Sequence, residues 1–268
     1  MDTPPEFDRT KVEAGIKPTG TVYLVGAGPG APDLLTLRAA RIIGDADIVF
    51  HDALIHPDVV AMARKAIIVS VGKRCGTHST AQRFINKRVV DAAREHAVVV
   101  RLKGGDPMLF GRAQEEITAL ETAGIPFEVI PGITAALAAS AETATSLTQR
   151  GAARSVTFVT PRVGAGQEAS CWAAPLRAAD AAAIYMGLRE ASAITANLLA
   201  TGMPEATPLV VVENASLPNA RRFYGTLGSL QAIAELDLTG PAVILIGAQF
   251  VERNSMRSLE LDVGALAA

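Results

Sequence analysis

The residues from Val98 to Arg112 have the types and spacing of a ligand-binding loop. An apolar, strand-like run ends there on Gly104 and Gly105, which carry no Cβ and tolerate positive φ, so a ligand can approach the main chain. Asp106 follows with two acceptor oxygens for a hydroxyl or ammonium group. The pattern predicts a loop that binds a polar small molecule, and an ordinary strand-to-helix turn is the structural alternative.

A second glycine-rich segment, Gly26 to Ala31, fits the pattern G-x-G-x-x-A that is typical of dinucleotide-binding folds. In such folds a pyrophosphate rests on backbone N–H groups at a helix N-terminus. Pro29 and Pro32 remove two of these donors. Asp52, just beyond the next strand, could still bind a ribose, so the motif alone leaves a dinucleotide-dependent oxidoreductase open.

Strands and helices alternate in the first half of the chain and would position these loops. Apolar periodicity predicts strands at 21–26, 46–50, 67–71, 98–102 and 127–130. Helices are expected between them, at about 33–43, 57–64, 80–96 and 111–123. Such alternation is typical of a parallel sheet with helices on both faces, whose ligands lie beyond the carboxyl ends of the strands.

The break at 131–134, followed by an alanine-rich helix at 135–141, indicates a domain boundary. Further strands are expected at 155–160, 182–186, 208–213 and 242–247, with a helix at 191–200. We therefore predict a flexible N-terminal tail at 1–19, an N-terminal α/β domain at 20–131, a C-terminal α/β domain at 132–252 and a C-terminal tail at 253–268.

Composition excludes several classes of partner. The 268 residues carry a formal net charge of −2, which gives no overall attraction to nucleic acid or to an anionic membrane. Cys75 and Cys171 are too few for a disulfide framework or a zinc site, and we expect free thiols. The first residues lack the features of a signal peptide, and no apolar run approaches membrane-spanning length. We expect a cytoplasmic protein without a metal.

Several motifs occur in one order between about residues 20 and 250. They are Val25-Gly-Ala-Gly-Pro-Gly30, Val71-Gly-Lys-Arg74, Arg101-Leu-Lys-Gly-Gly-Asp-Pro107, Phe110-Gly-Arg112 with Glu115-Glu116, Pro131-Gly-Ile-Thr-Ala135, Tyr185-Met-Gly187 and Val212-Glu-Asn214. Together they resemble the tetrapyrrole methylase family, and this co-occurrence is far more specific than either glycine loop alone.

The resemblance implies a two-domain α/β enzyme with a mostly parallel sheet in the N-terminal domain and a mixed C-terminal domain. It implies a homodimer that binds S-adenosyl-L-methionine between the domains and releases S-adenosyl-L-homocysteine. The members most similar in these motifs methylate uroporphyrinogen III at C2 and C7 to give precorrin-2. A methylase of another corrin precursor and a catalytically degenerate tetrapyrrole-binding paralogue remain alternatives, and the later pathway could be that of sirohaem, cobalamin or haem d1.

The resemblance also implies site residues. The positions that match the cofactor site are Pro29, Gly104, Gly105, Asp106, Leu109, Thr134, Ala135, Met186 and Ala215. Asp106 suits an acceptor for the ribose or amino group, so we expect that its loss would weaken binding and leave the fold intact. Met186 suits a soft apolar contact, although methionines more often fill gaps in a core.

Two polar pairs match positions at the reaction centre, Asp52 with Lys73 and Arg112 with Glu115. Arginine is a poor base, so we favour Asp52 as the proton acceptor and Arg112 as an anchor for a substrate carboxylate. Uroporphyrinogen carries many carboxylates, and a local cluster of cations would bind them. The expected substrate contacts are Arg74, Lys103 and Arg150, with Arg101 and Arg154 as further candidates.

The sequence departs from the family pattern at three places on the presumed substrate side. Gln149 stands where relatives usually have histidine, so a proton-transfer role near neutral pH is absent at that position. Pro161-Arg162 replaces Gly-His, and Ala113-Gln114 replaces a pair of glycines. These departures leave the cofactor better supported than the identity of the substrate.

Overall fold

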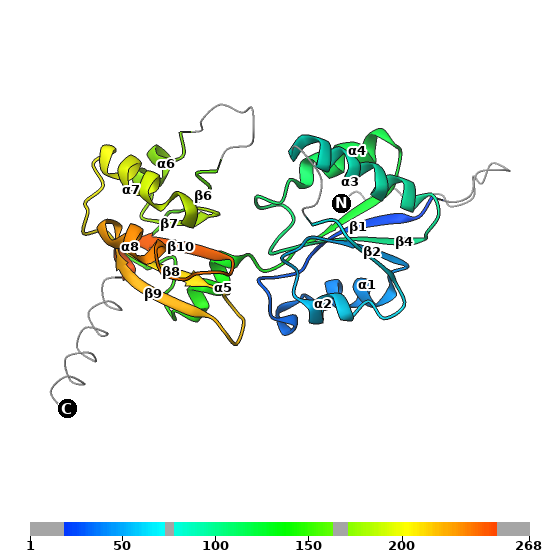
Figure 1. Ribbon diagram of the computed structural model, residues 1–268, viewed down its shortest axis with the longest axis horizontal. Helices are drawn as coiled ribbons and strands as arrows, with labels where there is room; N and C mark the ends of the chain where they lie inside the picture. The colour runs from blue at the N-terminus through cyan, green and yellow to red at the C-terminus, as the bar shows by residue number, and fades with distance from the viewer. Residues whose placement is uncertain (1–18, 73–77, 163–170, 251–268) are drawn as a thin grey trace, which may run out of the picture.

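The computed structural model describes residues 19–72, 78–162 and 171–250, which form two five-stranded sheets side by side (Figure 1). The first sheet has the order β3-β2-β4-β1-β5, and its neighbouring strands are all parallel. Its strands are β1 (Thr21–Gly26), β2 (Ile48–His51), β3 (Ile67–Ser70), β4 (Val98–Lys103) and β5 (Phe127–Ile130). The predicted parallel sheet is confirmed.

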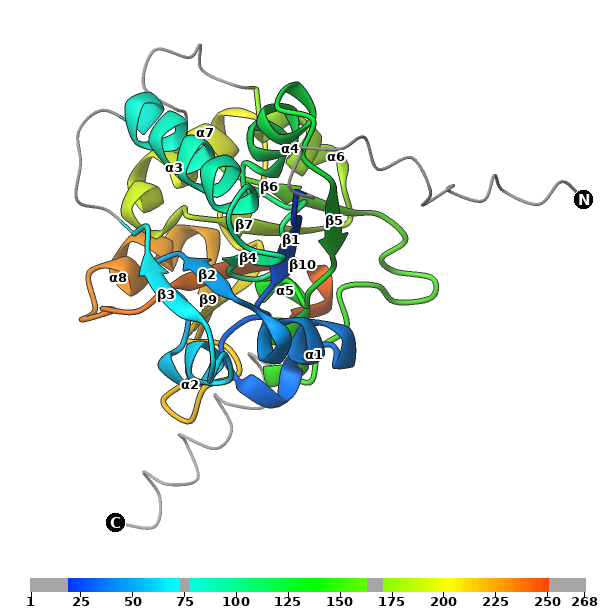
Figure 2. The ribbon, with the colours of Figure 1, turned by 90° about the vertical axis from the view of Figure 1, so that its right-hand side faces the viewer.

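Helices cover both faces of the first sheet, so its central strands β1, β2 and β4 are largely buried, whereas the edge strand β3 is mostly exposed (Figures 1 and 2). Leu24 packs in the core beneath α3 (His78–Ala93) and α4 (Ala113–Thr122). The next residue, Val25, points to the opposite face and packs in the core beneath α1 (Leu37–Asp45) and α2 (Pro57–Ala61). Helix α1 begins later than expected because Pro32–Leu34 form a separate 3-10 turn (η1) and Thr36 caps the helix.

The second sheet is mixed, as predicted, with the order β6-β7-β10-β8-β9. β6 (Val156–Val159) is parallel to β7 (Ala181–Tyr185), and the remaining neighbours are antiparallel. β8 (Pro208–Glu213) and β10 (Ala242–Gly247) coincide with their predicted ranges. β9 (Arg221–Thr226) was not predicted, because this edge strand is polar and only partly buried.

The second sheet also has helices on both faces. α5 (Ala135–Glu142) packs on one face, and α7 (Ala191–Ala200) packs on the other. The short elements on this half are α6 (Ala173–Ala178), α8 (Leu230–Ala234), η2 (Leu188–Glu190), η3 (Leu227–Ser229) and η4 (Ala248–Phe250), and sequence periodicity predicted none of them.

The chain leaves the first core and enters the second within a few residues. Ile130 at the end of β5 is buried in the first core, whereas Ala136 in α5 is buried against the second sheet. These contacts support the proposed domain boundary near Pro131. Among the residues that the structure describes, no helix is both long enough and apolar enough to cross a membrane.

Candidate active site

Three backbone segments meet beyond the carboxyl ends of β1, β4 and β5. Gly28 and Gly105 exchange hydrogen bonds, with Gly105 N–H donating to Gly28 O (2.7 Å) and Gly28 N–H donating to Gly105 O (3.2 Å). A Cβ on Gly132 would lie 2.3 Å from Gly105 O, so no other residue fits there. Gly105 has φ +65°, a left-handed conformation in which any other residue would be strained.

Gly104 differs from its neighbour. It is exposed, and a Cβ built on it would meet only Ile55 Cδ1, at 3.9 Å. The fold therefore does not require glycine at this position, and the open space beside its main chain can admit a ligand. Of the two glycines, Gly105 is structural and Gly104 is the better candidate for ligand contact.

Both carboxylate oxygens of Asp106 already hold the loop together. Oδ1 accepts from Met108 N–H (2.8 Å), and Oδ2 accepts from Gly132 N–H (2.9 Å). Each oxygen has one further lone pair, so Asp106 can still contact a ligand. The expectation that its removal would leave the fold intact does not agree with these two bonds.

We therefore expect Asp106→Ala to lower stability by about 1–3 kcal/mol, because two backbone donors lose their acceptors. Asp106→Asn should be intermediate, because its amide oxygen can replace one of the two acceptors. Denaturant-induced unfolding measures both changes. An alanine variant as stable as the wild type would show that these bonds contribute nothing to the loop.

Three backbone donors of the Gly26–Ala31 segment are already used within the protein and are not free for a pyrophosphate. Ala27 N–H donates to Lys103 O (2.7 Å), Gly28 N–H donates to Gly105 O (3.2 Å) and Ala31 N–H donates to Ser216 Oγ (3.0 Å). Moreover, α1 begins at Leu37, well beyond the glycines. This geometry argues against the dinucleotide-binding interpretation of the motif.

The loop after β8 brings the second half of the chain to this segment. Besides the Ser216 bond, Leu217 lies so close to Gly30 that a Cβ there would be 3.0 Å from Leu217 Cδ2. Ala215 is buried in this loop, between Asn214 and Ser216, which both have positive φ. The expected cofactor positions Pro29 and Ala215 therefore belong to two loops that contact each other.

An aromatic cluster joins the loop after β4 to the end of β7. Phe110 packs against Tyr185 with ring centroids 5.1 Å apart. The Tyr185 hydroxyl accepts from Ala136 N–H (3.1 Å) and shares a hydrogen bond with Thr134 Oγ1 (2.5 Å). Burial raises the pKa of Tyr185, so its hydroxyl stays protonated at neutral pH. Sequence reasoning did not select Tyr185 or Phe110, although both stand in motifs that carried the family resemblance.

Met186 directly follows this strand and is not a core residue. Its side chain is 45% exposed, and its φ of +55° is unusual for a residue other than glycine. Phe110 and Arg112 share this left-handed conformation, with φ of +54° and +57°. Such strained positions concentrate at functional sites, which favours a ligand contact for Met186 over the gap-filling role.

A buried ion cluster lies on the side of the first sheet that faces α3 and α4. Arg101 bridges two carboxylates, with Nε donating to Glu116 Oε1 (2.9 Å) and Nη2 donating to Asp52 Oδ1 (2.6 Å). Lys103 Nζ lies 3.0 Å from Glu116 Oε2. Burial and the nearby Arg101 lower the pKa of Lys103. Lys103 and Arg101 are therefore buried and paired. This differs from the expectation that they present positive charge to a substrate.

The other expected polar residues are more accessible. The Asp52 side chain is 37% exposed. Arg112 and Glu115 form an exposed two-bonded pair, with both N···O distances 2.7 Å. Arg150 is exposed in the turn between α5 and β6, as are Gln149 and Arg154. Lys73, Arg74 and Cys75 lie outside the described residues, and Cys171 is an exposed free thiol.

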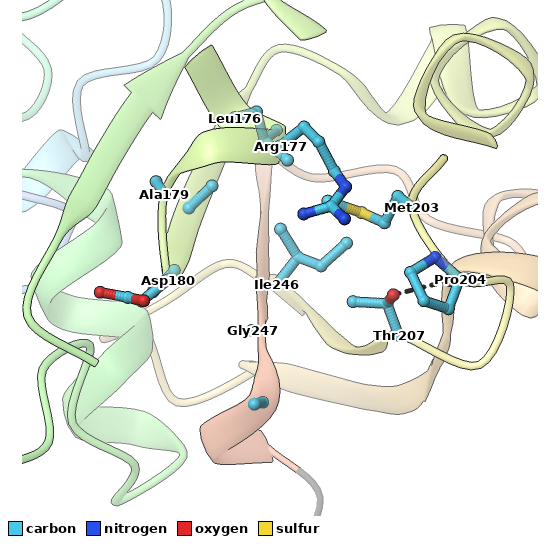
Figure 3. Close-up of a pocket in the computed structure, with 12 residues that line it drawn as sticks. Leu176, Arg177, Ala179, Asp180, Met203, Pro204, Thr207, Ile246 and Gly247 are labelled. Atoms are coloured by element: carbon cyan, nitrogen blue, oxygen red, sulfur yellow. Dashed lines mark hydrogen bonds between the residues drawn. The ribbon is translucent and has the colours of Figure 1, made fainter. Parts of the chain in front are cut away.

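A cavity of about 140 Å³ lies elsewhere, at the opposite end of the second sheet (Figure 3). It is lined by Ala181 at the start of β7 and by Gly247 at the end of β10. Tyr185 lies at the other end of β7, away from this cavity. Figure 3 shows Leu176, Arg177, Met203 and Ile246 around it. None of the expected site residues that the structure describes lines this cavity.

Known proteins with similar sequences and structures support one family. Residues 21–231 match the tetrapyrrole (corrin/porphyrin) methylases. The chain is 45% identical over 232 residues to a uroporphyrinogen-III C-methyltransferase of Pseudomonas aeruginosa, covering 85% of this chain and 94% of that protein. It is 44% identical over 237 residues to a siroheme synthase of a Psychrobacter species, covering 88% of this chain and 49% of that protein. The chain spans about half the length of the siroheme synthases that it matches.

Solved structures agree with the sequence relatives. A uroporphyrin-III C-methyltransferase of Thermus thermophilus in complex with S-adenosylhomocysteine has a TM-score of 0.74 and 36% identity, covering 85% of this chain and 98% of that one. A cobalt precorrin-4 methyltransferase has a TM-score of 0.75 and 26% identity, covering 87% of this chain and 98% of that one. Sequence, fold and the contacts between its two glycine loops thus agree, and the chain belongs to the tetrapyrrole (corrin/porphyrin) methylase family.

Proposed function

We propose that this protein transfers methyl groups from S-adenosyl-L-methionine to C2 and C7 of uroporphyrinogen III, giving precorrin-2. The observation that carries this proposal is the meeting of the Gly104–Asp106 loop, the glycine loop after β1 and the loop after β8 in a family member. The Pseudomonas and Thermus methyltransferases, which this chain resembles over most of its length, support the same substrate and the same cofactor.

The residues around these loops fit an adenosylmethionine ligand. Gly104 leaves open space beside the main chain, and Met186 offers an exposed, polarizable side chain. We assign the cofactor site to a set of residues from both halves of the chain, namely Pro29, Gly104, Gly105, Asp106, Leu109, Thr134, Ala135, Met186 and Ala215. The bound cofactor supplies an electrophilic methyl group, and the protein mainly has to align it with the accepting carbon.

Two polar groups would then serve the substrate. Methylation of a pyrrole carbon creates a cation that must lose a proton, and Asp52 is the proposed acceptor. One of its oxygens is bound by Arg101, and the carboxylate remains partly exposed. Arg112, held by Glu115 at the exposed start of α4, is the proposed anchor for a substrate carboxylate. Roles for Lys73, Arg74 and Arg150 rest on the family resemblance.

The decisive experiment is incubation of the purified protein with uroporphyrinogen III and S-adenosyl-L-methionine, followed by mass analysis of the product. Two added methyl groups are expected. If the protein methylated another corrin precursor and not uroporphyrinogen III, its substrate would be a different intermediate. Binding without methyl transfer would indicate a catalytically degenerate paralogue. S-adenosyl-L-homocysteine should raise the melting temperature, whereas NADPH should leave it unchanged, because only a ligand of the native state stabilises it.

We also propose a cytoplasmic homodimer, on the family resemblance alone. Light scattering during size-exclusion chromatography should then give about twice the 27.9 kDa of the chain. A monomeric mass would remove the dimer from the proposal without affecting the proposed reaction.

A further inference from the structure

The buried ion cluster beneath Asp52 consists of Arg101, Lys103 and Glu116. Arg101 and Glu116 have side chains only 3% exposed, and Lys103 is buried beside them. Burying charges costs several kcal/mol for each ion, and apolar residues of similar size often stabilise a core equally well. This cluster of charges at the end of β4 therefore suggests a role beyond holding α4 on the sheet.

Arg101 reaches Asp52 in one fixed direction because Glu116 holds the other side of the guanidinium. Its Nη1 donates to Leu102 O (3.0 Å), so all three nitrogens of Arg101 have acceptors. Among the described residues, Asp52 is thereby held through Oδ1 only. No side chain or backbone group of this part of the chain donates a hydrogen bond to Oδ2 of this partly exposed carboxylate, which leaves that oxygen available to a substrate.

Glu116 is in turn tied to the second polar pair of the site. Gln82 Nε2 donates to Glu116 Oε1 (3.2 Å) and to Asn86 Oδ1 (2.8 Å). Asn86 Nδ2 donates to the backbone oxygen of Glu115 (3.0 Å), whose side chain pairs with Arg112. One connected set of hydrogen bonds, which passes through the backbone oxygen of Glu115, thus links the proposed proton acceptor with the proposed carboxylate anchor.

We propose that Glu116 is a positioning residue for methyl transfer, which acts through Arg101 to fix the Asp52 carboxylate with Oδ2 toward the substrate. This inference rests on the proposed function, in which Asp52 accepts the proton. Glu116 itself is buried and touches no reactant.

Two double variants separate positioning from charge balance. Lys103→Met/Glu116→Gln and Lys103→Met/Glu116→Met each remove one positive and one negative charge, so both leave the Arg101–Asp52 pair neutral. Only the glutamine variant keeps an acceptor for Arg101 Nε. We expect the methionine variant to have a kcat at least about tenfold below that of the glutamine variant, because a small misplacement of a reacting group can cost up to about a hundredfold.

The KM for S-adenosyl-L-methionine should agree within about twofold between the two variants, since a purely structural effect would disturb binding and turnover together. Asp91→Asn, which removes the exposed pair with Lys87 on α3, is the control for charge changes in this domain. Equal kcat values in the two double variants would overturn the proposal.

Crystal structures of the two double variants provide a readout that does not depend on the substrate. The Asp52 carboxylate should keep its position in the glutamine variant and move in the methionine variant. An unmoved Asp52 in both would overturn the inference even if turnover fell. If the wild-type protein transferred no methyl group, the proposed function would fail, whereas these structures would still decide whether Glu116 positions Asp52.

Discussion

Replacement of Asp52 by asparagine is expected to reduce methyl transfer by about a hundredfold or more, the usual contribution of a positioned general base. The amide oxygen can still accept from Arg101 Nη2, so the side chain keeps its place and loses mainly its basicity. Binding of S-adenosyl-L-homocysteine should not change, because none of the proposed cofactor contacts is altered. Initial rates between pH 6 and 9 and a binding titration would measure both effects.

Asp58→Asn is a matched control for this variant. Asp58 is an exposed acid in the first turn of α2, and its carboxylate lies 3.7 Å from His56 Nδ1, its only ionic partner in the described part of the chain. Its turnover should equal that of the wild type. If Asp52→Asn retained its turnover across the whole pH range, another group would accept the proton. Asp52 would then have only a structural role, as the hydrogen-bond partner of Arg101.

Strong apolar runs made much of the fold predictable from sequence. The ranges of β8, β10 and α7 agree with their predictions because their buried positions follow a regular pattern. β9 was missed because it begins with two arginines and contains Gly225. An edge strand needs little apolar surface, so its sequence carries no strong strand pattern. The five or six residues of α8 and α6 are too few to establish a helical period.

In the candidate site, the sequence predicted the position of the glycine and aspartate loop but not the burial of the charged side chains. The glycine and aspartate loop follows from residue types, but Arg101 and Lys103 look like surface cations in sequence. Their spacing held a clue, since positions two apart on a strand share a face, and both faces of a parallel sheet are covered. Two buried cations on one face require a buried acid, which Glu116 on α4 supplies.

Gly104→Val should abolish tight cofactor binding while leaving the fold intact. A Cβ at this exposed position meets only Ile55 Cδ1, at 3.9 Å, so we expect stability to stay within about 0.5 kcal/mol of the wild type. The added methyl groups would occupy the space beside the main chain that the cofactor needs. We expect the affinity for S-adenosyl-L-homocysteine to fall at least about tenfold, which corresponds to about 1.4 kcal/mol.

Gly132→Ala gives the opposite result and completes the test. Its Cβ would lie 2.3 Å from Gly105 O, so the two loops must separate, and stability and cofactor binding should fall together. Gly44→Ala, within α1 and with open space around it, controls for the loss of a glycine and should slightly stabilise the protein. Calorimetric titration and thermal unfolding of the three variants distinguish these outcomes. If Gly104→Val bound S-adenosyl-L-homocysteine as tightly as the wild type, the cofactor would have to lie away from the Gly104–Asp106 loop.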